Sequence, residues 1–230
     1  SGKSDEESTE EHRITVDEEK KNPADFALWK LGEFERSWTS PWGEGRPGWH
    51  IECSAMSSET LGNHFDIHCG GVDNMFPHHE NEIAQSQCAT DQPFVNVWLH
   101  SEFLLVDGGK MSKSLGNFYR IGDLKTMGFS PECIRYQLLA GHYRTKISFS
   151  ADKKHEGDKV VRRISDLYSR LEKRNASEIA NGTLPVAYSK FRDWMNDDLD
   201  SPRALAVFFD WMKFVNIKID QKNISESELG

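Results

Sequence analysis

The stretch HFDIHCGGVDNMFPHHENEIAQSQC, residues 64–88, decides the class of fold. Apolar residues alternate with polar ones from His64 to His68 and lead into a Gly-rich segment, which predicts a short strand that ends in a turn. Pro77 suits the first position of a helix that runs to about Cys88. A second apolar run, residues 95–106, predicts another buried strand. Strand, helix and strand in this order predict a parallel α/β unit.

The flanking segments predict the rest of the architecture. Residues 38–49 are rich in turn-forming residues and aromatics, which predicts a packed loop. A helix is expected over residues 50–61. Beyond Gly122 the pattern is helical, with Ser130 as an N-cap and apolar residues at three- and four-residue intervals between 153 and 174. Further helices are expected over 187–195 and 202–219. The predicted divisions are a charged flexible segment (1–22), an α/β part (23–145) and a helical part (146–230).

Composition narrows the class of protein. The 230 residues include 28 Lys+Arg and 37 Asp+Glu, for a formal net charge of −9, which argues against a nonspecific coat on nucleic acid. No apolar run is long enough for a transmembrane span. The four cysteines lack the spacing of a disulfide framework, so a reducing compartment is expected. We therefore expect a soluble, cytoplasmic protein with no membrane partner.

A candidate metal site lies near residue 80. His78 and Glu82 are four residues apart, so on a helix they share one face. Cys53, on another predicted element, is able to add a thiolate. One cysteine, one histidine and one glutamate would leave a fourth zinc position open, which is typical of catalytic sites. Ile83 stands where a His-Glu-x-x-His protease needs its second histidine. The alternative is a polar helix surface and an ordinary buried cysteine.

Two further segments suggest a nucleotide site. Lys110 and Lys113 lie in a loop with small hydroxyl residues and glycines, and such a loop is able to fold over a polyphosphate. Gly70 and Gly71 follow a predicted strand, where glycines let a nucleotide approach the backbone and Asp73 would accept from ribose hydroxyls. The alternatives are an exposed basic loop and a plain tight turn.

Four linked segments strongly resemble the cysteinyl-tRNA synthetase family: GRPGWHIECSAM at 45–56, HFDIH at 64–68, FPHHENEIAQS at 76–86 and KMSKS at 110–114. The resemblance covers about residues 24–215. A KMSKS loop alone would indicate only a class I synthetase. The resemblance implies the second half of a Rossmann-like class I synthetase nucleotide-binding fold, followed by an α-helical domain on the tRNA side that includes the start of the anticodon-binding region.

The resemblance also implies a ligand set. Zinc, one per subunit, would bind the thiolate of the substrate, with Cys53, His78 and Glu82 as three of its four protein ligands. Trp49 would line the pocket for L-cysteine. Lys110 and Lys113 would be catalytic, and Mg²⁺ would accompany ATP. The implied ATP-binding residues are His68, Gly70, Gly71, Asp73, Met111 and Lys113.

The activity that the resemblance implies has two steps. L-cysteine is activated by ATP to cysteinyl-adenylate, and the cysteinyl group is then transferred to tRNA(Cys). A hydrophobic pocket separates near-isosteres by only about 1–3 kcal/mol. Bonding between thiolate and zinc differs in kind from that of a serine hydroxyl, so such a site would reject serine without editing.

This chain departs from the family pattern in three ways. It holds no His-x-Gly-His motif, and it lacks the cysteine that supplies the fourth zinc ligand in the family's first half. Cys69 stands where the family usually has glycine. We therefore expect a fragment that is inactive alone. A monomer is the expected oligomeric state.

Alternatives remain open. Basic residues between Lys153 and Arg174 suggest a face for the tRNA backbone, but the interleaved acids favour a solvated helix face instead. The whole protein could instead pass activated cysteine to an amine acceptor. The chain could also be a non-catalytic zinc- or RNA-binding remnant of a synthetase.

Overall fold

The computed structural model describes residues 20–22, 25–172 and 184–220. The chain forms two compact units, Ser1–Ser101 and Glu102–Gly230. Most of the predicted charged segment, residues 1–22, lies outside the described residues. None of the described helices is long and apolar enough to cross a membrane.

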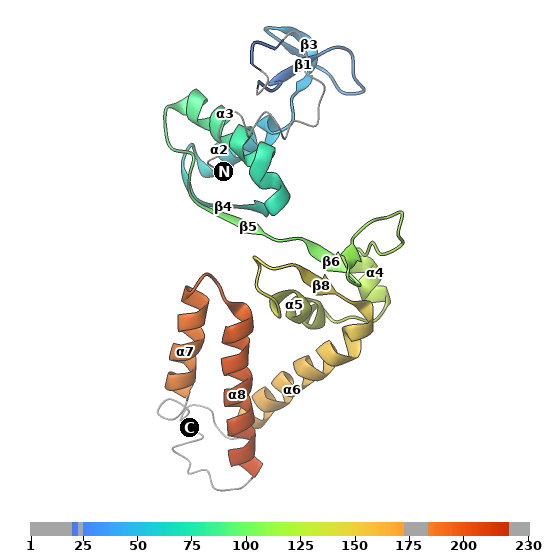
Figure 1. The fold of residues 1–230 in the computed structure, drawn as a ribbon, viewed down its shortest axis with the longest axis vertical. Coiled ribbons are helices and arrows are strands. Elements are labelled where there is room, and N and C mark those ends of the chain that lie inside the picture. Colours follow the sequence, from blue (N-terminus) through green and yellow to red (C-terminus); the bar gives the residue numbers. More distant parts are fainter. Residues whose placement is uncertain (1–19, 23–24, 173–183, 221–230) are drawn as a thin grey trace. The chain divides into compact units, whose positions relative to one another are not determined.

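The predicted parallel α/β unit is confirmed in the first compact unit (Figure 1). Strand β4 (Phe65–Gly71) pairs in parallel with β5 (Val95–Ser101), and helix α3 (Glu80–Thr90) connects them. Helix α2 (Ile51–Leu61) packs against α3, and the two lie together on one side of the strand pair. The fully buried Phe94 ring meets Phe65 edge-on at 5.1 Å between centroids, which anchors the start of β5.

Two short 3₁₀ or π turns link β4 to α3. They are η1 (Val72–Asn74) and η2 (Met75–His79). Within η2 the backbone of Phe76 is extended, with φ −138° and ψ 134°. Helical conformation therefore begins at Pro77, as the sequence predicts. Gly70 and Gly71 belong to β4, so the strand is longer than expected and the turn falls at Val72–Asn74 instead.

The prediction of a loop over residues 38–49 was wrong for most of the segment, since only residues 41–42 and 48–49 lie outside strands. Strands β1 (Trp29–Leu31), β2 (Trp38–Ser40) and β3 (Gly43–Pro47) form an antiparallel sheet in the order β1-β3-β2. Gly45 makes this possible, because a Cβ there would lie 2.2 Å from the carbonyl oxygen of Lys30. Turn-forming residues at such short strands hide the period-two pattern.

The apolar run at residues 95–106 is two strands rather than one. β5 ends at Ser101, and β6 (Leu104–Val106) belongs to the second compact unit. There β6 pairs antiparallel with β7 (Gly109–Lys110) and in parallel with β8 (Ile147–Phe149). The chain leaves the first ladder because the Glu102 amide donates to the carbonyl of Tyr143 at 2.7 Å. Since β6 pairs with β8, the two sides of the predicted boundary near 145 share one small sheet.

Helices fill the rest of the second unit. α4 (Ile121–Thr126), α5 (Pro131–Leu139), the 3₁₀ turn η3 (Ala151–Lys153) and α6 (Lys154–Glu172) surround the small sheet. Ser130 accepts from the Cys133 amide, which confirms the predicted N-cap. The core here is apolar and consists of Leu124, Phe129, Cys133, Ile134 and Phe149.

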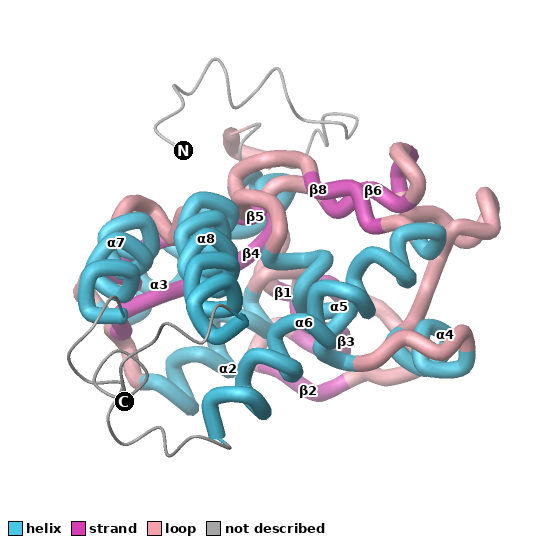
Figure 2. Tube along the Cα trace, turned by 90° about the horizontal axis from the view of Figure 1, so that it is seen from below, coloured by secondary structure: helices cyan, strands magenta, loops and turns pink. Residues whose placement is uncertain are grey.

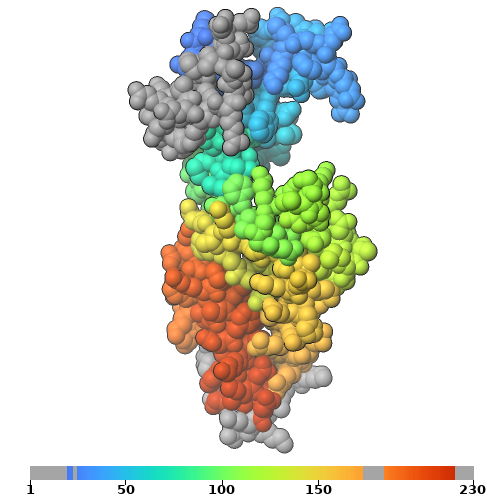
Figure 3. Space-filling model, turned by 45° about the vertical axis from the view of Figure 1, so that its right-hand side comes forward, coloured from blue at the N-terminus to red at the C-terminus, as the bar shows by residue number. Residues whose placement is uncertain are grey.

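Two long helices end the described chain. α7 (Leu184–Asn196) and α8 (Ser201–Asp220) lie side by side (Figure 2). A second apolar cluster of Leu167, Met212 and Ile219 joins α8 to α6, and the atoms of the two helices are in contact in Figure 3. The helices predicted over 153–174, 187–195 and 202–219 are thus confirmed over their described parts.

Candidate metal centre and nucleotide-binding segments

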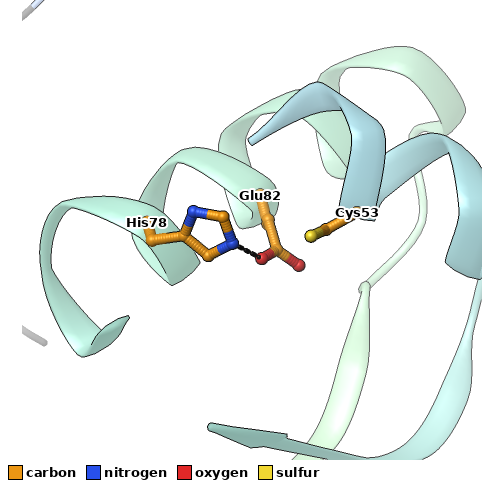
Figure 4. A group of neighbouring side chains, drawn as sticks. All are labelled: Cys53, His78 and Glu82. Carbon is orange, nitrogen blue, oxygen red and sulfur yellow. Dashed lines mark ion pairs between the residues drawn. The ribbon is translucent and has the colours of Figure 1, made fainter. Parts of the chain in front are cut away.

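The fold brings Cys53, His78 and Glu82 together. Cys53 comes from α2, and the other two lie one turn apart where η2 runs into α3 (Figure 4). Their ligand atoms all lie within 4.8 Å of one another. His78 is 9% and Glu82 0% exposed, so the cluster is closed to bulk water on the α3 side. A hydrogen bond of 2.6 Å from the Ser54 hydroxyl to Gln85 ties α2 to α3 beside it.

One oxygen of Glu82 is unsatisfied. Glu82 Oε1 lies 2.8 Å from His78 Nε2, yet it has no hydrogen-bond partner of acceptable geometry in the described structure. Buried polar atoms are nearly always hydrogen-bonded, so an orphaned carboxylate oxygen needs an explanation. A cation shared by Glu82 Oε1, His78 Nε2 and Cys53 Sγ would satisfy all three atoms. Thiolate, imidazole and carboxylate are the donor set that zinc takes, so these residues fit the implied metal.

A second group of possible ligands shares Glu82. His68, His79 and Glu82 also place ligand atoms within 4.8 Å of one another. Here, however, the polar atoms already have partners: His68 Nε2 bonds Glu82 Oε2 at 2.7 Å, and His79 Nδ1 bonds His100 Nε2 at 2.7 Å. Because its contacts are ordinary hydrogen bonds, this second group does not call for a cation.

The electrostatics of the cluster follow from burial. Burial raises the pKa of the Cys53 thiol above its ordinary value, and the nearby Glu82 and Glu52 carboxylates raise it further. Without a cation the thiol form is therefore favoured; a bound cation would reverse this by stabilising the thiolate. Burial also lowers the pKa of His50 and of His79 to about 4, with neighbouring histidines adding to the effect. Both rings are neutral at pH 7.

Trp49, predicted to line the amino-acid pocket, lies beside the cluster. Its indole is 64% exposed and stacks on the His50 ring, with centroids 4.9 Å apart and planes 20° apart. Its centroid is 5.4 Å from that of His78. An exposed aromatic surface next to the candidate metal ligands is a feature that a small substrate is able to contact.

Gly70 and Gly71, which were predicted to let a nucleotide approach the backbone, also lie too close to neighbouring side chains to carry a Cβ. A Cβ at Gly70 would lie 2.5 Å from His79 Cε1, and one at Gly71 would lie 2.4 Å from Asp73 Oδ1. Asp73 therefore folds back over the end of β4. Cys69 lies inside the strand, paired with Leu99, so no left-handed turn is needed at that position.

The loop that carries Lys110, Met111 and Lys113 lies in the second compact unit and is organised by Asn117. The Asn117 side chain accepts from the Ser112 amide at 2.8 Å and donates to the Lys110 carbonyl at 3.1 Å. Lys113 is exposed, with its ammonium 5.5 Å from the centre of the Phe118 ring. The backbone is thus closed into a compact loop while the ammonium stays accessible.

Sequence reasoning missed two residues of these sites. Asn117 was given no role, although its side-chain amide bonds the backbone of Lys110 and Ser112 within the lysine motif. Asparagine in a Gly-rich turn was the available signal. His50 was quoted within a motif but given no role. Its contact with His78, 28 residues away, leaves no local pattern.

The basic helix predicted as a tRNA face is α6. Some of its charges are already paired: Lys154 Nζ bonds Asp158 at 2.8 Å, and Arg170 bonds Asp220 of α8 at 2.6 Å. These two basic side chains therefore form ion pairs within α6 and between α6 and α8.

The sequence matches known families over most of its length. Residues 1–159 match the family described as the tRNA synthetases class I (C) catalytic domain, and residues 190–229 match the DALR domain. The chain is 48% identical over 223 residues to a protein named cysteine–tRNA ligase from Brachyspira hyodysenteriae, covering 93% of this chain and 47% of that protein. A protein of the same name from Hydrogenovibrio crunogenus is 50% identical over 217 residues, covering 94% and 46%. The chain thus spans about half the length of these relatives.

A solved structure has a similar fold. It is that of Agrobacterium radiobacter K84 agnB2 LeuRS in a ternary complex with tRNA and LeuAMS. The TM-score is 0.65 over 84% of this chain and 30% of that chain, at 15% identity. At this identity the likeness concerns the fold alone.

Proposed function

Because this chain belongs to the family of class I (C) tRNA synthetase catalytic domains, we propose that it is part of a cysteine–tRNA ligase. Membership confirms the family resemblance and the predicted fold class, an α/β synthetase part followed by a helical domain. The proposed activity of the whole protein is the ATP-dependent joining of L-cysteine to tRNA(Cys). The observation that supports the choice of amino acid is the Cys53, His78 and Glu82 cluster with its orphaned carboxylate oxygen.

In the proposed mechanism these three residues would hold zinc. The metal would supply a soft acceptor for the substrate thiolate, which a serine hydroxyl does not match. His78 and Glu82 lie one turn apart where η2 continues into α3, so the backbone sets their spacing. Trp49 would cover the side chain of the substrate and exclude water from it.

The remaining proposed residues act on ATP. Lys110 and Lys113 would offset the negative charge that develops as the cysteine carboxylate attacks the α-phosphate and pyrophosphate leaves. Asn117 would hold their loop in shape. Mg²⁺, when bound with ATP, would neutralise part of the phosphate charge. The proposed adenylate-binding set is His68, Gly70, Gly71 and Asp73, with Met111 in the lysine loop. In the second step a ribose hydroxyl of tRNA attacks the acyl carbon and AMP leaves.

Cobalt spectroscopy tests the amino-acid site in this chain. Co(II) replaces zinc, and its bonds to thiolate absorb in the near ultraviolet as charge-transfer bands. We expect a band with the wild-type chain that grows on adding cysteine and does not change with serine. The Cys53→Ser variant should lose the protein-derived part of the band. A chain that binds no Co(II), or binds it equally without Cys53, would contradict the proposed site.

The alternative acceptors are separated by a transfer assay. The DALR match at residues 190–229 favours tRNA over a small amine. For the parent enzyme we expect cysteine-dependent pyrophosphate exchange and transfer to tRNA. For this chain alone we expect no exchange, because it lacks the His-x-Gly-His motif. Transfer to an amine by the parent would support the amine-acceptor ligase instead.

A further inference from the structure

One carboxylate in the turn between α7 and α8 holds a loop that lies far earlier in the chain. Asp198 Oδ2 accepts from Arg144 Nε at 2.5 Å, and Oδ1 accepts from a second guanidinium nitrogen at 3.1 Å. The Tyr143 hydroxyl also donates to Oδ1, at 2.5 Å. Exposed ion pairs contribute little on average, but a guanidinium that contacts both oxygens of a carboxylate fixes orientation as well as charge. This contact therefore sets the position of the turn on the loop.

A second contact lies at the start of α8. Ser201, the first residue of that helix, donates from its hydroxyl to the carbonyl of Leu139 at the end of α5, at 2.8 Å. Between the two contacts the backbone is left-handed, with φ 53° at Asp198 and 57° at Leu199. Such a backbone persists only where surrounding contacts hold it. The Leu199 side chain is 46% exposed, so its own packing does not supply that hold. We define the hairpin joint as Tyr143, Arg144, Asp198 and Ser201.

The loop that receives the turn also supports the strand that leads to the lysine loop. The Tyr143 carbonyl accepts from the Glu102 amide at 2.7 Å, shortly before β6 begins. β8 follows the loop and pairs with β6, and its Ser148 hydroxyl accepts from the Gly108 amide at 3.0 Å. Gly108 lies in the turn between β6 and β7, directly before the lysine loop. Hydrogen bonds thus connect the α7–α8 turn, through this loop and β8, with the base of the lysine loop.

The remaining contacts of α8 with the rest of the unit are of a different kind. Near its end, Met212 and Ile219 pack on Leu167 of α6, and along its length Phe209 meets the Tyr136 ring edge-on at 6.3 Å. Apolar contacts are not directional, so they permit small rotations that the hydrogen bonds of the hairpin joint do not. The joint is therefore the contact that fixes the angle of the α7–α8 hairpin against the small sheet.

We propose that Asp198 is a positioning residue for the transfer step: through Tyr143 and Arg144 it fixes the angle between the α7–α8 hairpin and the sheet that carries the lysine loop. The inference rests on the proposed function, in which one tRNA has to reach both the DALR part and the activated cysteine. A changed angle would displace the attacking ribose, and a displacement of about 1 Å is able to lower a rate about 100-fold. Activation of cysteine precedes the use of tRNA and should not depend on this angle.

The test compares the two steps in the parent enzyme. Cysteine-dependent pyrophosphate exchange measures activation, and kcat and KM for tRNA(Cys) measure transfer. Asp198→Asn removes the carboxylate on a backbone that asparagine tolerates, and Tyr143→Phe is a milder variant that removes one hydrogen bond. Asp197→Asn is the matched control, because the contacts of Asp197 in the described structure are those of its backbone amide.

We expect Asp198→Asn to lower kcat/KM for tRNA(Cys) about 10- to 100-fold, while pyrophosphate exchange stays within about twofold of the wild type. Tyr143→Phe should show a smaller loss of the same kind, because the pair between Arg144 and Asp198 remains. Asp197→Asn should match the wild type in both assays. A variant that is merely less stable would lose exchange and transfer together, so the split between the two steps is specific to positioning.

Equal losses of exchange and transfer would make Asp198 a residue of general stability and overturn the inference, and so would unchanged transfer. If Asp198→Asn does not fold, Tyr143→Phe decides the case by the same two assays. A wild-type parent that shows no cysteine-dependent exchange would overturn the proposed function itself. That failure is distinguishable, because it is seen before any variant is made.

Discussion

His78 Nε2 and Glu82 Oε1 lie 2.8 Å apart in the protein interior, yet Glu82 Oε1 has no hydrogen bond among the described residues. Two acceptor atoms brought this close repel each other unless a proton or a cation lies between them. With Cys53 Sγ within 4.8 Å of both, the three residues form a group that is able to hold a cation. In the neighbouring group, which shares Glu82, His68 Nε2 and His79 Nδ1 each have a hydrogen-bond partner.

Replacing Glu82 by glutamine separates metal binding from folding. Glu82→Gln keeps the shape but removes a buried charge, so metal affinity should fall by more than about 100-fold, beyond the effect of an outer-sphere partner. The amide is able to donate toward His78, so the metal-free chain should gain about 1 kcal/mol in free energy of unfolding. Metal titration and urea unfolding with a chelator measure the two effects.

The exposed Glu59 on α2 gives the control. Glu59→Gln should change neither quantity. If Glu82→Gln instead destabilises the metal-free chain by more than about 1 kcal/mol, the carboxylate is a structural partner of a protonated His78. The metal interpretation would then lose its main support.

Asn117 should govern the lysine loop through two separable contacts. Asn117→Ala removes both the acceptor for the Ser112 amide and the donor to the Lys110 carbonyl, so hydrogen exchange at the Ser112 amide should become faster. Asn117→Asp keeps the acceptor and should preserve protection at Ser112. Equal exchange in all three proteins would show that the side chain does not hold the loop.

Asp198 should make stability depend on pH. Hydrogen bonds from the Arg144 guanidinium and then the Tyr143 hydroxyl hold the pKa of the Asp198 carboxyl below its ordinary value. Because the folded pKa is the lower one, this stabilisation is complete above the ordinary pKa and is lost as pH falls through the folded pKa. Asp198→Asn should therefore lower the urea midpoint at pH 7, and the difference should shrink toward pH 3.

Asparagine tolerates the left-handed backbone at position 198, where φ is 53°, so the substitution removes the carboxylate without straining the chain. Asp197→Asn is the neighbouring control and should show no such pH-dependent difference. A constant difference between Asp198→Asn and wild type from pH 7 to pH 3 would refute the role of the ion pair.

Gly157 should be essential to the packing of α6 on α5. A Cβ at this position would lie 2.5 Å from Sγ of Cys133, which is 0% exposed. Overpacking of this kind costs about 1–3 kcal/mol, which outweighs the gain of about 1 kcal/mol from alanine in a helix. We expect Gly157→Ala to lower the free energy of unfolding, and to cost less in a Cys133→Ala background.

Gly122→Ala on α4 is the matched control, because a Cβ there meets nothing within 4 Å. It should be neutral or stabilising by up to about 1 kcal/mol. Additive effects of Gly157→Ala and Cys133→Ala would show that the predicted contact is not what limits this position.

Local pattern predicted the elements that carry the site but not all of their boundaries. Alternation located β4, Pro77 marked the start of the helix before α3, and apolar spacing located α6 and α8. The strand predicted over 95–106 failed because its break depends on a hydrogen bond from Glu102 to Tyr143, 41 residues further along the chain. Nothing within the run itself signals that contact.

The amino-acid sequence determined the family, the order of elements and the identity of the candidate ligands, because these follow from motifs and from periodicity within a few turns. Tertiary structure alone decided which atoms of those candidate ligands have hydrogen-bond partners from other segments. His50 and His68 reach His78 and Glu82 from other elements, 28 and 14 residues away. Contacts with distant segments engage His78 Nδ1 and Glu82 Oε2, which makes His78 Nε2 and Glu82 Oε1 the atoms of the candidate metal site. No local sequence pattern encodes that difference between the atoms.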